Sequence, residues 1–262
     1  METLKVLTEY YSNYDEEGRL LSRHGQVEYL TTMRYIEMYL KPGMRILEIG
    51  AATGRYSHAL ARKDYQVDAV ELVQHNIDQF VVNAKPGERV TIRQGNAKDL
   101  SFFPDDTYDI TLLLGPMYHL FTIEDQKQAL SEAIRVTKKG GILFAAYCGN
   151  DATMVQYCFG RGMLKEKRYQ DLIDFNTFKA SSDPAELFQL YRKEDIDGLI
   201  AGFPVERLHY VGADMATNYM RQTIDEMDDE FFRLYLKYHF TICERSDMVG
   251  VSHHILDILR KV

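Results

Sequence analysis

Short apolar runs alternate along residues 27–148 with segments in which apolar positions recur at helical spacing. The runs predict buried strands, and the periodic segments predict amphipathic helices. The predicted strands cover 44–50, 66–72, 90–95, 108–115 and 142–148, and the predicted helices cover 27–40, 56–64, 75–84 and 123–137. Helices that connect apolar strands indicate right-handed crossovers and a parallel sheet covered on both faces.

The alternation breaks after Gly149. Residues 150–193 mix aromatic, charged and short apolar groups, with Gly160, Gly162 and Pro184 as breaks, and they predict a cap inserted into the fold. The pattern then predicts a helix over 193–203, a strand over 205–212, helical structure over 213–244 and a closing strand over 252–261.

These elements predict a Rossmann-like α/β fold. We expect a seven-stranded, mostly parallel sheet with helices on both faces and a hairpin-like pair of late strands at one edge. The chain is therefore expected to have three parts: an N-terminal helical arm or lid over 1–43, a core over 44–149 and 194–262, and the cap over 150–193.

Composition narrows the classes of protein to consider. The chain has 262 residues with a net charge of -8, which argues against a general phosphate-binding surface and makes nucleic acid an unfavoured partner. The three cysteines are odd in number and widely spaced, without a CxxC pair, so we expect free thiols. No signal-like or membrane-spanning segment stands out, and no helical His-x-x-x-His motif occurs. We therefore expect a cytoplasmic protein without a membrane partner or a metal.

The segment RILEIGAATGRYSHAL, residues 45–60, concentrates small residues where the first strand passes into a helix. Such a turn lets a ligand approach the backbone, and the N–H groups that open the next helix face that ligand. The segment reads Glu48-x-Gly50-x-Ala52-x-Gly54. This spacing fails the GxGxxG pattern of dinucleotide-binding proteins, which disfavours an NAD-dependent oxidoreductase. A turn without a ligand stays open on this segment alone.

Three further strand ends carry suitable residues. Glu71 ends the second strand, where a carboxylate can accept hydrogen bonds from two ribose hydroxyls. Asn96 and Ala97 follow the third strand and suit an adenine edge, and Leu114 and Gly115 end the fourth. Carboxyl ends of parallel strands meet at one edge of a sheet, so these residues predict a single nucleotide-like site.

Taken in order, these segments resemble the core of the class I S-adenosylmethionine-dependent methyltransferases over residues 44–148. The phrases LLLGPMYHL (112–120) and RVTKKGGILFAAY (135–147) are similar to those of small-molecule-type bacterial members. Ala52 replaces the middle glycine of the family's first motif, and Asn96 stands where the family often has Asp.

The resemblance implies a role for each matching residue. Gly50, Ala51, Ala52 and Gly54 would line the methionine and ribose parts of the cofactor, and Glu48 would fix the turn. Glu71 would hold the ribose, Leu72 would flank the adenine, and Asn96 and Ala97 would meet the adenine edge. Leu114 and Gly115 would lie beneath the turn, near the sulfonium.

The segments that flank this core supply the remaining candidates. The resemblance implies that the arm closes over the cofactor, with Tyr14 and Arg23 as contacts, although a solvated arm is the alternative. An arginine there could pair with the methionine carboxylate. Tyr118 and His119 follow the fourth strand, where an acceptor would approach. His119 is either a general base or a structural histidine, and Tyr118 either assists it or walls the pocket. His253-His254 is expected to lie in the sheet or at the surface.

The resemblance therefore implies transfer of a methyl group from S-adenosylmethionine to a small-molecule acceptor by in-line displacement, with S-adenosylhomocysteine as product. The aromatic residues of the cap suit an uncharged or aromatic acceptor, or else form the cap's own core. An RNA methyltransferase and a non-catalytic cofactor-binding domain are the alternatives. The protein is expected to act as a monomer or homodimer.

Overall fold

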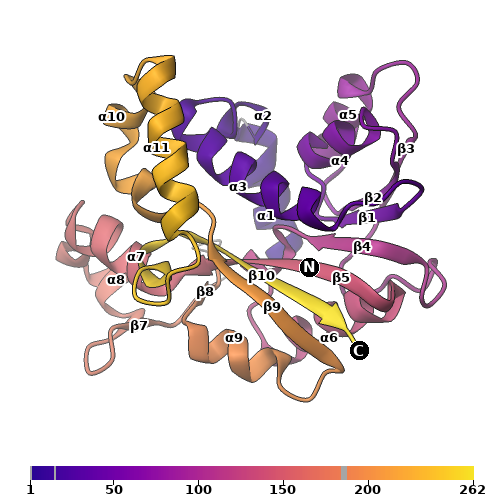
Figure 1. The fold of residues 1–262 in the computed structure, drawn as a ribbon. Coiled ribbons are helices and arrows are strands. Elements are labelled where there is room, and N and C mark those ends of the chain that lie inside the picture. The colour runs from indigo at the N-terminus through magenta and orange to yellow at the C-terminus, as the bar shows by residue number, and fades with distance from the viewer. Residues whose placement is uncertain (1, 15, 184–187) are drawn as a thin grey trace.

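The computed structural model describes residues 2–14, 16–183 and 188–262, so the predicted break at Pro184 lies outside the described residues. Its centre is a twisted sheet with helices on both faces (Figure 1). In spatial order the strands are β3 (Val90–Gln94), β2 (Gln66–Glu71), β1 (Arg45–Ile49), β4 (Tyr108–Leu113), β5 (Thr137–Gly149), β10 (His254–Lys261) and β9 (Val205–Gly212).

The strand directions confirm the predicted fold class. Strands β1 to β5 pair in parallel, and β10 runs antiparallel to both β5 and β9. Strand β9 therefore ends at the same edge of the sheet as β5, and β10 begins there. Of the seven strands given above, six have their carboxyl ends at this edge, and β10 has its amino end there.

Two details of the sheet differ from the prediction. Strand β5 begins at Thr137 instead of 142, because Thr137 pairs with Tyr108 as soon as the preceding helix ends. A short strand, β8 (Leu190–Tyr191), adds to the carboxyl end of β5 through Cys148. The sequence pattern treated this last segment as part of the cap.

Two layers of helices cover the sheet (Figure 1). One face carries α3 (Arg23–Tyr39), α4 (Arg55–Ala61) and α5 (Gln74–Asn83), and the other carries α6 (Ile123–Val136) and α9 (Lys193–Ile200). Successive strand residues point to opposite faces of the sheet. Ile46 therefore packs in the core on the side of α3 and α4, and Leu47 packs in the core on the side of α6 and α9.

The remaining elements gather beyond the carboxyl edge. Before α3 lie α1 (Glu2–Asn13) and α2 (Glu16–Arg19). The cap contains α7 (Asn150–Thr153), the π-helix η2 (Met154–Phe159), η3 (Met163–Lys165), α8 (Lys167–Gln170), β6 (Ile173–Asp174) and β7 (Lys179–Ala180). The other short elements and late helices are η1 (Pro116–Tyr118), η5 (Met215–Met220), α10 (Arg221–Asp225), α11 (Asp229–Ile242) and η6 (Val249–Val251).

The division into arm, core and cap stays a proposal. The arm's Met1 and Asp15 and the cap's residues 184–187 lie outside the described residues. Cys148, Cys158 and Cys243 are buried free cysteines. In the described parts of the chain, no helix combines the length and apolar character needed to cross a bilayer.

Candidate functional site

A cavity of about 1290 Å³ opens at the carboxyl edge of the sheet. Its walls come from the strand ends, the arm, the cap and the segments on either side of α10 and α11. The volume exceeds that of a typical single-ligand pocket, about 300–1,000 Å³. The cavity is therefore large enough to hold two ligands side by side.

The structure gathers most of the predicted site residues around this cavity. Those that line it are Tyr14, Glu48, Gly50, Ala51, Ala52, Glu71, Leu72, Asn96, Ala97, Leu114, Gly115, Tyr118 and His119. Gly54 and Arg23 are not among the lining residues.

The turn after β1 is built from residues in left-handed backbone conformations. Gly50, Ala52 and Gly54 have φ values of +79°, +47° and +88°. A Cβ on Gly50 would lie 2.6 Å from Cδ of Pro116, so the turn needs glycine to pack against the loop after β4. Gly54 opens α4, and a Cβ there would lie 2.5 Å from the Phe80 ring. Gly54 thus stands behind the cavity wall, as a packing position.

Glu71 ties the turn after β1 to the end of β2. Its Oε2 accepts the backbone N–H of Ala52 at 2.9 Å, and its Oε1 accepts the N–H of Val73 at 2.9 Å. Asn76 donates to the same Oε1 at 3.4 Å. Burial raises the pKa of this carboxyl. The turn and the loop after β2 thus hold this carboxylate at the cavity wall.

Glu48 connects β1 to the helix that follows the turn. Its carboxylate accepts the backbone N–H of Ser57 at 2.9 Å and also the Ser57 hydroxyl. Burial raises the pKa of Glu48 to about 8, so its protonated form is favoured at neutral pH. These contacts support the predicted turn-fixing role, which stays a prediction.

The arm reaches the cavity through aromatic side chains of α1 and the residue that follows it. The Tyr11 hydroxyl lies 2.9 Å from Nε2 of His119, and Tyr14 stacks on Tyr10 with ring centroids 5.0 Å apart. Tyr10 in turn meets the edge of the Phe188 ring. The arm and the cap therefore touch across the cavity, as a closing lid requires.

Arg23, which was predicted to contact the cofactor, is not among the described residues that line the cavity. Its guanidinium donates to Asp229 at 2.7 Å and lies over the Phe232 ring, because the first turn of α3 faces α11. Arg19 lines the cavity instead and donates to Glu28 at 2.7 and 3.3 Å.

Tyr118 and His119 occupy the loop after β4 as expected. Burial is the main cause that raises the pKa of Tyr118 well above its ordinary value, so its hydroxyl stays protonated. Tyr118 can therefore donate a hydrogen bond but cannot accept a proton at neutral pH. His119 Nε2 is already engaged by Tyr11.

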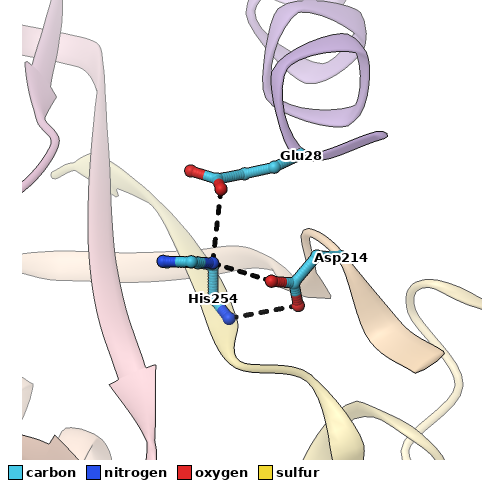
Figure 2. Close-up of side chains that lie close together, drawn as sticks. All are labelled: Glu28, Asp214 and His254. Atoms are coloured by element: carbon cyan, nitrogen blue, oxygen red, sulfur yellow. Dashed lines mark hydrogen bonds and ion pairs between the residues drawn. The ribbon is translucent and has the colours of Figure 1, made fainter. Parts of the chain in front are cut away.

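Three polar residues from distant segments meet beside these groups, as Figure 2 shows. Nδ1 of His254 lies 2.7 Å from Oδ2 of Asp214 and 3.3 Å from Oε2 of Glu28. All three residues line the cavity. Burial alone would raise the pKa of Asp214, but the charge and hydrogen bond of His254 hold it far below its usual range.

No role was predicted for these three residues from the sequence, although the sequence carries a signal for two of them. Asp214 follows the carboxyl end of β9 much as Glu71 ends β2, and His254 opens the antiparallel strand β10 at the same edge. One ligand atom from each of Glu28, Asp214 and His254 lies within 4.8 Å of the others, a spacing that also suits a metal ion. Arg19 and the donors around Asp214 already occupy these carboxylates, so the geometry is that of a hydrogen-bond network.

Comparison with known proteins gives a consistent result. Residues 46–141 match a family of methyltransferase domains. A demethylmenaquinone methyltransferase of Clavibacter sepedonicus is 31% identical over 138 residues, covering 52% of this chain and 54% of that protein. An S-adenosyl-L-methionine-dependent Diels-Alderase, iccD of Talaromyces variabilis, is 28% identical over 106 residues, covering 39% and 35%. The chain thus spans about a third to a half of the length of these relatives.

A solved structure shares the fold across the whole chain. It is a SAM-dependent methyltransferase of Thermotoga maritima, described as a possible histamine N-methyltransferase, with a TM-score of 0.59 and 18% identity. It covers 99% of this chain and 100% of that one. Residues 46–141 are thus similar to a methyltransferase domain, and the fold and the strand-end residues support a class I S-adenosylmethionine-dependent methyltransferase. S-adenosylmethionine is the cofactor of that class.

Proposed function

We propose that this chain transfers the methyl group of S-adenosylmethionine to a small-molecule acceptor held in the same cavity. The observation that carries the proposal is a single cavity that joins the glycine turn after β1 to the cap. The cofactor supplies an activated methyl group, so the protein has to align the acceptor, exclude water and take up any proton.

The residues at the strand ends fit this cofactor. The Glu71 carboxylate lies at the cavity wall beside the turn, where ribose hydroxyls would meet it, and Asn96 and Ala97 line the wall beyond it. Gly115 has a φ of +110°, and a Cβ there would meet only the Gly50 carbonyl oxygen, at 3.9 Å. That space beneath the turn suits the predicted position of the sulfonium.

The arm residues fit the amino-acid end of the cofactor. Arg19 and Tyr14 line the cavity on the arm side, and we transfer the proposed carboxylate contact from Arg23 to Arg19. Arg19 is already held by Glu28, so its guanidinium would be shared between Glu28 and the ligand. A planar guanidinium with five N–H groups can make both contacts.

The cap forms the acceptor half of the cavity. Its lining side chains are mostly apolar or aromatic: Met154, Tyr157, Cys158, Met163, Tyr169, Leu172 and Ile173. Such a wall favours an uncharged or aromatic molecule over RNA, whose binding would need cationic phosphate contacts. From the methyltransferase relative we carry over the reaction alone.

The direct test is transfer of isotopically labelled methyl from S-adenosylmethionine to panels of phenols, thiols and amines, with RNA as a separate arm. We expect label in at least one small-molecule class and none in RNA. Gly50→Arg should abolish the transfer, because its side chain fills the turn. If the protein binds the cofactor but labels no acceptor, the result would favour a domain that binds the cofactor without transferring its methyl group. The relative named as an S-adenosyl-L-methionine-dependent Diels-Alderase is an example of a different activity that depends on this cofactor.

A further inference from the structure

We propose that His254 is the general base of this site and that it removes the proton of a phenol-type acceptor, with Asp214 and Glu28 as its positioning residues. The inference rests on the proposed methyl transfer and adds the group that acts on the acceptor. It replaces His119 as the leading candidate for this role.

His254 is held by two carboxylates at one of its ring nitrogens. Its Nδ1 lies between two carboxylates, Asp214 at 2.7 Å and Glu28 at 3.3 Å, so Nδ1 carries the proton (Figure 2). The tautomer is thereby fixed, and the lone pair of the neutral ring lies on Nε2. Figure 2 shows Nε2 on the side of the ring away from Asp214.

Asp214 is itself rigidly placed. Its Oδ1 accepts the Ser252 hydroxyl at 2.6 Å and the backbone N–H groups of His253 and His254 at 2.9 and 3.2 Å. Its Oδ2 accepts from Asn218 and from His254. The carboxylate thus fixes both the segment that leads into β10 and the ring of His254. A base held in this way loses little conformational freedom when it meets an acceptor.

His254 also lies where an acceptor would meet the cofactor. His254 lines the cavity, and its side chain is 23% exposed, while no described residue bonds to its Nε2. Its ring centroid lies 6.0 Å from that of Tyr118, which follows the Gly115 turn. Nε2 is therefore available at the boundary between the cofactor half and the cap half.

Neither neighbouring histidine, His119 or His253, combines a fixed ring with an Nε2 atom available in the cavity. Nε2 of His119 is taken by the Tyr11 hydroxyl. Nε2 of His253 is buried with no hydrogen-bond partner among the described residues, and burial lowers the pKa of His253 to about 4. His253 sits between the rings of Tyr157 and Tyr219, so it belongs to the aromatic wall that would hold an acceptor ring.

The surrounding charges tune this base. Burial lowers the pKa of His254, but Glu28 and Asp214 outweigh burial and raise it. The other titratable groups that face it are Arg19 from α2, Tyr118 from η1, Cys148 as its pairing partner on β5, and His253 beside it. The resulting imidazolium would be stabilised by two carboxylates, which favours proton uptake from a weakly acidic acceptor.

The proposed step balances as follows. The acceptor O–H bond breaks and its proton passes to Nε2 of His254. The acceptor oxygen forms a bond to the methyl carbon while the methyl–sulfur bond breaks, and that electron pair stays on sulfur. The products are an aryl methyl ether and S-adenosylhomocysteine, and the imidazolium then returns its proton to solvent.

The test uses His254→Asn, because the asparagine amide can still donate to Asp214 but has no group at the Nε2 position. His75→Asn, at an exposed position on α5, is the matched control. S-adenosylhomocysteine should bind wild type and both variants alike. In its complex with wild type, bound 4-nitrophenol should show phenolate absorbance at a pH at least about one unit lower than in His254→Asn.

Transfer to phenols of graded acidity supplies the second readout. His254→Asn should slow transfer to weakly acidic phenols by about 10²-fold or more, and transfer to phenols already ionised by less than about threefold. Equal slowing of both would contradict a base and indicate a structural role. Binding of S-adenosylhomocysteine with neither binding nor methylation of any phenol would overturn the acceptor class stated here. Absence of S-adenosylhomocysteine binding to wild type would instead overturn the proposed function.

Discussion

Oε2 of Glu71 accepts the backbone N–H of Ala52 at 2.9 Å, so the end of β2 holds the turn that follows β1. The same carboxylate caps its own loop through Val73. A residue expected to contact the cofactor thus also shapes the surface on which the cofactor would lie. The two roles can be separated only by measuring stability and ligand binding on the same variant.

Glu71→Gln is predicted to destabilise the fold and weaken cofactor binding together. The glutamine NH₂ group would face the backbone N–H of either Ala52 or Val73, and that N–H would then lack a hydrogen-bond acceptor. We expect a loss of about 1–3 kcal/mol in the free energy of unfolding and at least a tenfold loss of S-adenosylhomocysteine affinity. Urea unfolding and calorimetry measure these effects. Glu37→Gln, on the exposed Glu37–Lys63 pair, should change stability by less than about 1 kcal/mol.

Gly50→Ala is predicted to be more damaging than Gly87→Ala. Both glycines have positive φ, +79° and +90°, so both substitutions carry the left-handed strain of about 1–2 kcal/mol. At Gly50 the new Cβ would crowd its surroundings, 2.8 Å from the Leu114 carbonyl oxygen, whereas at Gly87 no described residue beyond its chain neighbours would lie within 4 Å of it. Crowding should add about 1–3 kcal/mol at Gly50. Equal losses of unfolding free energy would contradict this packing argument.

His239 is predicted to make the protein acid-sensitive. Burial lowers the pKa of His239 from 6.5 to about 4, so between these values the unfolded chain binds a proton that the folded chain does not. Stability should therefore fall as pH decreases from about 6.5 to 4, by about 3 kcal/mol for this group. His239→Leu should reduce the difference between unfolding free energies at pH 7.5 and pH 5. The exposed His75→Leu should leave that difference unchanged.

The hydrogen bond between Tyr11 and His119 is predicted to hold the arm over the cavity. It joins residues 108 positions apart, from α1 and from the loop after β4. A double-mutant cycle with Tyr11→Phe and His119→Phe should give a coupling energy of about 0.5–1.5 kcal/mol. Tyr11→Phe should also speed proteolysis within residues 2–14. Additive effects of the two substitutions would show that this bond does not anchor the arm.

Much of the sheet could be predicted because its strands are continuous apolar runs. Strand β4, from Tyr108 to Leu113, is buried at almost every position, and 205–212 was predicted with the bounds that β9 has. The short strand β8 was missed, since two residues carry no periodicity and its pairing depends on the distant Cys148.

Some residues of the candidate site could likewise be predicted from local sequence patterns, and others could not. Gly50, Glu71 and Gly115 could be found because they lie at strand ends that local patterns mark. Glu28, Asp214 and His254 could not be brought together, because their meeting depends on how α3 packs beside the late strands. Arg23 was preferred for the arm contact, yet the packing of α3 on α11 turns it toward Asp229.

Calorimetric titration with S-adenosylhomocysteine, with NAD as the parallel ligand, tests the central claim most directly. The account predicts micromolar binding of S-adenosylhomocysteine and no heat from NAD. Binding of NAD alone, or of neither ligand even after the arm residues before α3 are removed, would contradict the assignment of the glycine turn and Glu71 to this cofactor.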